Sequence, residues 1–92
     1  MPGPNLYKKY RQLIEALANE RRSGALGSLR DLLQQFQGDA AALDVATANF
    51  VCDELADQLE YEALRATSRH RRDVLLAAVK GFDGMSFAKA KP

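Results

Sequence analysis

Charged side chains in the second half of the chain fall into two stretches of opposite sign, residues 53–62 and residues 65–72. The first stretch has no base, and its acids are Asp53, Glu54, Asp57, Glu60 and Glu62. The second has no acid, and it contains Arg65, Arg69, Arg71 and Arg72 together with the only histidine, His70. Interspersed charges would solvate a helix equally well, so the segregation predicts surfaces that contact something of opposite charge.

Helical carboxylates three residues apart can converge on a metal ion in the core of a helix bundle, which makes a di-metal site one interpretation of the acidic stretch. Here the acids Asp53, Glu54, Asp57 and Glu60 are expected on the side of the helix away from its apolar residues, and no Glu-x-x-His motif accompanies them. A solvated helix face is the simpler interpretation. The functional interpretation that we favour over a metal site is a docking surface for a basic partner.

The arginines of the basic stretch have helical spacing. Arg65, Arg69 and Arg72 are four and three residues apart, so they share one face and could bind phosphates or carboxylates through paired N–H donors. Alternatively they bridge to nearby acids, because Glu62 with Arg65 and Arg69 with Asp73 have the spacing of helical ion pairs. The predicted partner-binding residues are therefore Arg65, Arg69, Arg71, Arg72, Asp53, Asp57 and Glu60.

Catalytic motifs are absent from the sequence. It contains no Walker loop, no dinucleotide-binding glycine pattern, no His-Glu-x-x-His and no Cys-x-x-Cys, and a zinc site would need more than one cysteine and one histidine. Cys52 and His70 could form a nucleophile and base, but Cys52 lies on an apolar stripe and is expected to be a buried structural thiol. We predict that the protein is not an enzyme and needs no cofactor.

Composition limits the architecture and the class of partner. Ninety-two residues form one domain, residues 1–92, in which residues 1–4 and 85–92 are expected to be flexible ends. A chain of this size buries only about 60 to 65% of its unfolded surface, so dimerisation would add stability. Thirteen basic against twelve acidic side chains leave a net charge of +1, which argues against binding of a polyanion by bulk charge.

The lack of a recognisable targeting signal leads us to expect a cytoplasmic protein. The first residues lack the basic and apolar regions of a signal peptide, and the single cysteine, Cys52, cannot form an internal disulfide. No apolar run approaches the roughly 18 residues that a membrane span requires, so we expect no membrane contact.

Hydrophobic periodicity predicts two helices in the first half. The first should begin after Asn5 as N-cap and end near Arg22, before Ser23 and Gly24; the second should run from Ser28 to Gly38. Their apolar faces carry Leu6, Tyr10, Leu13, Ile14 and Leu17, and Leu29, Leu32, Leu33 and Phe36.

Asp39 is placed to cap a third helix, and no glycine or proline follows before Gly81. Two apolar stripes lie in this segment, one containing Val45, Ala48, Cys52, Leu55, Leu59 and Ala63 and the other Leu75, Ala78, Val79 and Phe82. Because the stripes face different directions, we predict a break at residues 66–68, with Thr67 or Ser68 capping a fourth helix that ends at Gly81 or Gly84. A single continuous helix over residues 39–82 is the alternative.

These features predict an all-α fold, a small bundle of three to four helices with a long third helix, completed by dimerisation if Phe50, Val51 and Tyr61 are buried between two copies. The expected core is Leu13, Leu17, Leu32, Leu33, Phe36, Leu55, Leu59, Leu75 and Val79. The expected function is non-catalytic: an adaptor, regulator or inhibitor that binds a protein partner through its charge-segregated helical surface. A nucleic-acid-binding regulator that uses the four arginines is the alternative.

Overall fold

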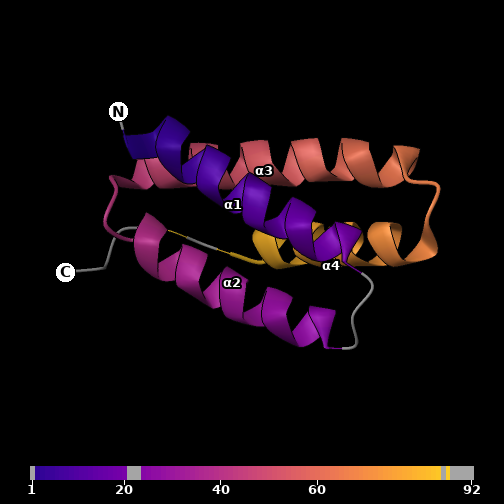
Figure 1. Cartoon of the computed structure of the whole chain (residues 1–92). Helices are drawn as coiled ribbons and strands as arrows, with labels where there is room; N and C mark the ends of the chain where they lie inside the picture. Colours follow the sequence, from indigo (N-terminus) through magenta and orange to yellow (C-terminus); the bar gives the residue numbers. More distant parts are fainter. Residues whose placement is uncertain (1, 21–23, 86, 88–92) are drawn as a thin grey trace.

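The computed structural model describes residues 2–20, 24–85 and 87, and it contains four helices (Figure 1). They are α1 (Pro2–Asn19), α2 (Ala25–Ala40), α3 (Val45–Arg65) and α4 (Arg69–Asp83). The described part of the chain contains no β-strand, and none of its helices is long and apolar enough to cross a membrane. The predicted all-α bundle is confirmed.

The helices α3 and α4 form an antiparallel hairpin, and α1 lies across it (Figure 1). α1 packs against all three other helices, whereas α2 packs mainly against α1 and α4. One face of α3 therefore has no helix against it. This exposed face carries three acids of the acidic stretch, Asp53, Asp57 and Glu60.

The break between α3 and α4 lies at residues 66–68, as the two apolar stripes predict. Ala66 and Ser68 have extended backbone conformations, with ψ of 135° and 134°, and the Ser68 hydroxyl accepts a hydrogen bond from the Arg71 N–H at 3.3 Å. The reversal folds the second stripe back onto the first, so Leu55, Leu59 and Leu75 are buried together in one core. The alternative of a single helix over residues 39–82 is wrong.

Several predicted helix ends are wrong. α1 begins at Pro2, so Asn5 lies inside it, and α2 begins at Ala25 after Gly24, whose φ of 89° is the left-handed conformation that glycine adopts most easily. Ser28 lies within the first turns of α2, and Gly38 lies inside that helix near its end. A single glycine costs a helix only about 1 kcal/mol relative to alanine, which is too little to end a helix whose other residues pack against the bundle.

Asp39 does not cap α3. It belongs to α2, and its carboxylate accepts a hydrogen bond of 2.6 Å from the hydroxyl of Tyr10 in α1. The cap is Asp44, which accepts hydrogen bonds from the Thr47 N–H at 3.0 Å and the Thr47 hydroxyl at 2.6 Å. Both aspartates precede helical stretches in the sequence, and only the contact with α1 distinguishes them.

The core is centred on Phe36, whose ring makes edge-to-face contacts with three others at centroid distances of 5.1 Å to Tyr10, 5.0 Å to Phe82 and 6.2 Å to Phe87. The predicted core residues that the structure buries are Leu17, Phe36, Leu55, Leu59, Leu75 and Val79. Leu32 and Leu33 are half-buried, and Leu13 is exposed, contrary to prediction. The neighbouring Ile14 is fully buried instead, because α1 presents that side to the bundle.

The two ends of the described chain are attached to the bundle. Residues 2–4 belong to α1, Met85 packs against the core, and Phe87 is buried within it. The other residues for which flexible ends were predicted, 1, 86 and 88–92, lie outside the described residues.

Candidate partner-binding surface

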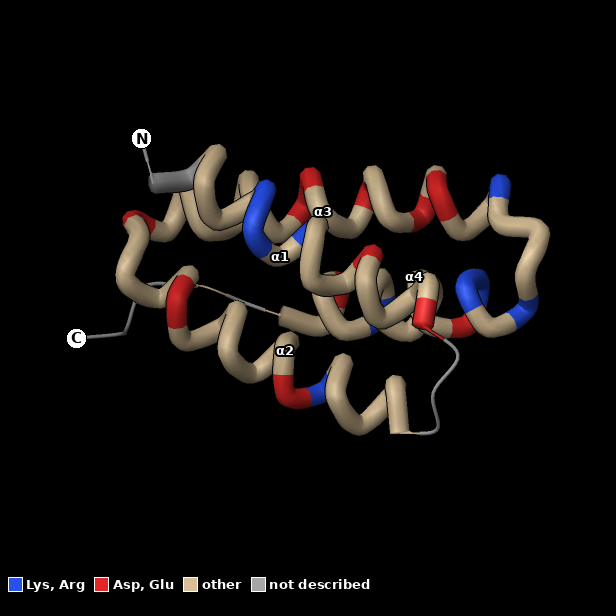
Figure 2. The backbone as a smooth tube through the Cα atoms, viewed as in Figure 1, with Lys and Arg blue, Asp and Glu red and all other residues tan. Residues whose placement is uncertain are grey.

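The acidic residues Asp53, Asp57 and Glu60 are exposed along α3, and none of them forms an ion pair with another described residue. Figure 2 shows acidic positions distributed along α3, with a basic position at its end and basic positions of α4 next to that end. The last residue of α3 is Arg65. The helical turn places these three carboxylates on the side opposite the buried residues Leu55 and Leu59.

Large apolar side chains share this side of α3. Phe50, Tyr61 and Leu64 are 63%, 55% and 78% exposed, and at 3.6 residues per turn they lie on the same side as Asp57. Leu64 was not among the predicted surface residues, although its position seven residues after Asp57 places it on this face. We call the following residues the outer face of α3: Phe50, Asp53, Asp57, Glu60, Tyr61 and Leu64.

The exposed arginines lie around the turn from α3 to α4. Arg69 has a side chain 88% exposed and pairs with Asp73 at 3.9 Å, so one of the two predicted helical ion pairs forms. Arg65 instead lies over the Tyr61 ring at 5.3 Å from its centroid, with a hydrogen bond of 3.4 Å to the hydroxyl. Arg72 is exposed and makes no ion pair within the described residues. Arg69 and Arg72 lie near the N-terminus of α4, where positive charge opposes the helix dipole, so folding alone does not favour them there. Arg65 is the last residue of α3, where the dipole favours its charge.

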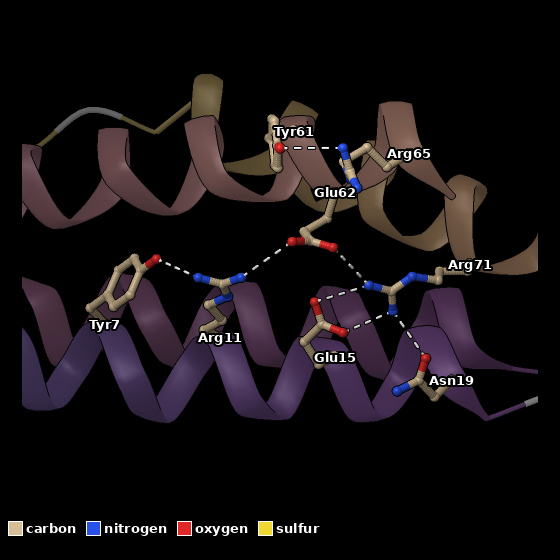
Figure 3. A network of polar contacts seen from close by, with 8 residues as sticks. All are labelled: Tyr7, Arg11, Glu15, Asn19, Tyr61, Glu62, Arg65 and Arg71. Atoms are coloured by element: carbon tan, nitrogen blue, oxygen red, sulfur yellow. Dashed lines mark hydrogen bonds and ion pairs between the residues drawn. The ribbon is translucent and has the colours of Figure 1, made fainter. Parts of the chain in front are cut away.

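Arg71 differs from the other arginines of the basic stretch because it is half-buried and bonds to side chains of two other helices (Figure 3). Its guanidinium contacts both carboxylate oxygens of Glu15 at 2.8 and 3.2 Å, the Asn19 side-chain oxygen at 2.9 Å and Glu62 at 3.3 Å. Only 21% of its side chain is exposed, and the hydrogen bond with Glu15 is the main cause that raises the pKa of Arg71. Its predicted role in partner binding therefore competes with three internal contacts.

The same network extends along α1. Glu62 also pairs with Arg11 at 3.6 Å, and Arg11 donates a hydrogen bond of 2.9 Å to the Tyr7 hydroxyl (Figure 3). Glu62 therefore pairs with α1 and α4 and not with Arg65, the predicted helical partner. This network links three helices, and it was not predicted because Glu15 and Arg71 are 56 residues apart in the sequence.

Cys52 of α3 lies beside the C-terminal end of α4, whereas His70 is near the N-terminal end of α4. Cys52 is buried and its Sγ donates to the Phe82 carbonyl oxygen at 3.1 Å, whereas His70 Nε2 donates to the Leu17 carbonyl oxygen at 3.3 Å. Phe82 and His70 are separated by twelve residues of helix, about 18 Å at 1.5 Å per residue. Burial raises the pKa of the Cys52 thiol to about 11. The structure thus does not bring the two together as a nucleophile and its base.

Metal ligands do not gather in the described residues: no group of three or more His, Cys, Asp and Glu side chains there is placed to hold a metal ion. The three exposed acids of α3 follow one another along the helix surface.

Comparison with protein-family models finds no match to this chain, and comparisons with curated protein sequences and with solved structures find none either.

Proposed function

We propose that this protein is a non-catalytic adaptor, regulator or inhibitor that binds another protein through the outer face of α3 and the exposed arginines Arg65, Arg69 and Arg72. The observation that carries the proposal is that large apolar side chains and unpaired acids remain exposed together on one helix after the internal ion pairs have formed. Scattered exposed leucines are ordinary, but several beside segregated charges on one face are typical of a contact surface.

A protein partner accounts for this surface better than nucleic acid does. Arg71 already bonds to three side chains, and Arg69 already has an ion pair. The unpaired acids of α3 would repel phosphates that approached the basic residues at the end of that helix. The alternative is a nucleic-acid-binding regulator, and the capture experiment distinguishes the two.

Self-association is a competing use of the same surface. Val51, one of the three residues on which that expectation depends, is buried inside the single chain, while Phe50 and Tyr61 remain exposed. Sedimentation equilibrium at micromolar concentration separates a homodimer from a monomer. For location, we propose the cytoplasm, where a reducing environment would keep the lone Cys52 as a thiol.

The proposal is tested by affinity capture from a nuclease-treated lysate of the cells that naturally make the protein, with the tagged full chain and mass spectrometry. We expect Arg69→Glu with Arg72→Glu to weaken capture more than about tenfold, or 1.4 kcal/mol. The melting temperature should hardly change, because exposed charges contribute little to stability. Lys8→Glu with Arg30→Glu is the matched control, since it reverses two exposed bases on α1 and α2.

Two results would contradict the proposal. Unfolding of the Arg69 and Arg72 variant, with the control still folded, would mean that these arginines serve the fold. A partner captured only from an untreated lysate, together with salt-dependent binding to duplex DNA, would favour the nucleic-acid alternative. On such probes the logarithm of the association constant should fall against the logarithm of the salt concentration with a slope of about 0.9 per phosphate contacted.

A further inference from the structure

The outer face of α3 is a narrow apolar strip with acids on and beside it. From Phe50 to Leu64 it covers fifteen residues, whose fourteen steps of 1.5 Å span about 21 Å, or about four helical turns. Asp57 and Leu64 lie along its middle, Phe50 and Tyr61 on one side, and Asp53 and Glu60 on the other. A straight strip of this length matches the contact that one helix makes along another.

The charges of this strip select its partner. Its three carboxylates have no ion-pair partner among the described residues. A purely apolar partner surface that covered Leu64 and Phe50 would remove water from these carboxylates without supplying bases in its place, which costs free energy. One guanidinium, that of Arg65, already lies over the ring of Tyr61, and Tyr61 is still 55% exposed. The complementary surface is apolar along its centre and basic along its edges.

A second copy of this chain does not supply that surface. An antiparallel two-fold pairing of α3 with α3, centred on Asp57, would place Asp57 against its own copy and bring three acids toward three acids. Like charges brought together in this way oppose association. The basic residues Arg69 and Arg72 belong to α4 and would not reach the centre of such a pairing.

We infer that the outer face of α3 binds a basic amphipathic helix of another protein, with Phe50, Tyr61 and Leu64 contacting its apolar residues and Asp53, Asp57 and Glu60 its lysines and arginines. This inference rests on the proposed function and gives the partner its chemistry. In this mode an amphipathic helix of the partner lies along α3 and contacts it through residues spaced three and four apart.

A matched pair of peptides tests the inference. A capped fourteen-residue peptide of leucine and lysine in helical periodicity is titrated against the full chain by fluorescence anisotropy, in parallel with the same peptide carrying glutamate for lysine. We expect the lysine peptide to bind at least tenfold more tightly. Backbone amide chemical shifts should change along α3 around Asp57 and Leu64, and not on α2.

Variants of the protein locate the contact. Asp57→Lys and Leu64→Ser should each weaken binding of the lysine peptide at least fivefold. The matched controls are Asp31→Lys and Leu26→Ser on α2, where Asp31 is exposed and Leu26 is 57% exposed, and they should leave the affinity unchanged. Circular dichroism of all four variants checks that they remain folded.

Three results would overturn the inference: no preference for the lysine peptide, an equal loss of affinity in the α2 controls, or a homodimer that Leu64→Ser dissociates. The last result would make a second copy the occupant. If the peptide fails to bind while capture of a protein still depends on Arg69 and Arg72, the proposed function stands and only this assignment of its partner is wrong.

Discussion

At the scale of single residues, the side chains that look alike in the sequence have different partners in the fold. Asp39 and Asp44 both precede helical stretches, yet Asp44 caps α3 and Asp39 binds Tyr10. The Tyr10 hydrogen bond and the nearby Lys9, whose Nζ lies 3.5 Å from the Asp39 carboxylate, lower the pKa of Asp39. Burial, followed by the bond to Asp39, raises the pKa of Tyr10.

The lowered pKa of Asp39 predicts a pH-dependent contribution to stability. Because the folded state favours the carboxylate, the contribution is fully present above the pKa of the unfolded chain, about 3.9, and is lost as the pH falls through the lower folded-state pKa. We expect Asp39→Asn to be less stable than the natural chain at pH 7 and to approach it in stability near pH 2.

Urea unfolding of both chains across this pH range measures the effect. In a Tyr10→Phe background the difference should shrink at every pH above 4, since the main cause of the pKa shift has been removed. An unchanged difference between pH 7 and pH 2 would contradict the assignment.

At the scale of helices, the structure requires a glycine at one helical position, Gly81, and not at another, Gly38. Gly38 in α2 has open space around it, whereas a Cβ added to Gly81 in α4 would clash with Leu33 Cδ1 of α2. Gly81 therefore allows α2 and α4 to approach closely. Gly38 has no such role, so its conformational cost is not offset by packing.

We expect Gly38→Ala to raise the free energy of unfolding by about 0.5 to 1 kcal/mol. The same substitution at Gly81 should give no gain or a loss of about 1 kcal/mol, because Leu33 must move. Urea denaturation of the two variants checks this. A larger gain at Gly81 than at Gly38 would mean that Leu33 rearranges without cost.

At the scale of the whole molecule, the network around Arg71 connects α1, α3 and α4 (Figure 3). It uses Glu62 from the acidic stretch and Arg71 from the basic stretch, so the two stretches meet at this point. Most of their other charges stay exposed, namely Asp53, Asp57, Glu60, Arg65, Arg69 and Arg72. The charge pattern therefore serves the fold at one position and leaves a surface for binding elsewhere.

Arg71→Ala should lower the free energy of unfolding by about 1 to 2 kcal/mol, because the partly buried carboxylates of Glu15 and Glu62 lose charge-assisted hydrogen bonds. Arg69→Ala, which removes an exposed arginine from the same helix, should cost less than about 0.5 kcal/mol. Thermal and urea denaturation compare the two. Equal costs would show that the network contributes no more than an exposed ion pair.

The sequence by itself determined the helical class and the burial of Cys52, Leu55, Leu59 and Leu75, and it favoured a break at residues 66–68, because each follows from periodicity along one segment. That the chain reverses direction at the break came only from the structure. The sequence also placed Asp53, Asp57 and Glu60 on the exposed side of their helix. Their binding role remains a prediction, since a charge pattern describes a surface and does not identify its partner.

Only the tertiary structure decided which polar groups meet. Arg71 with Glu15 and Tyr10 with Asp39 are 56 and 29 residues apart, and no local spacing distinguishes them from neighbours of the same charge. The same holds for Ile14, buried where the adjacent Leu13 is exposed. Periodicity defines the apolar face of a helix to within about one residue, and the position of the helices packed against it decides which side chains are covered.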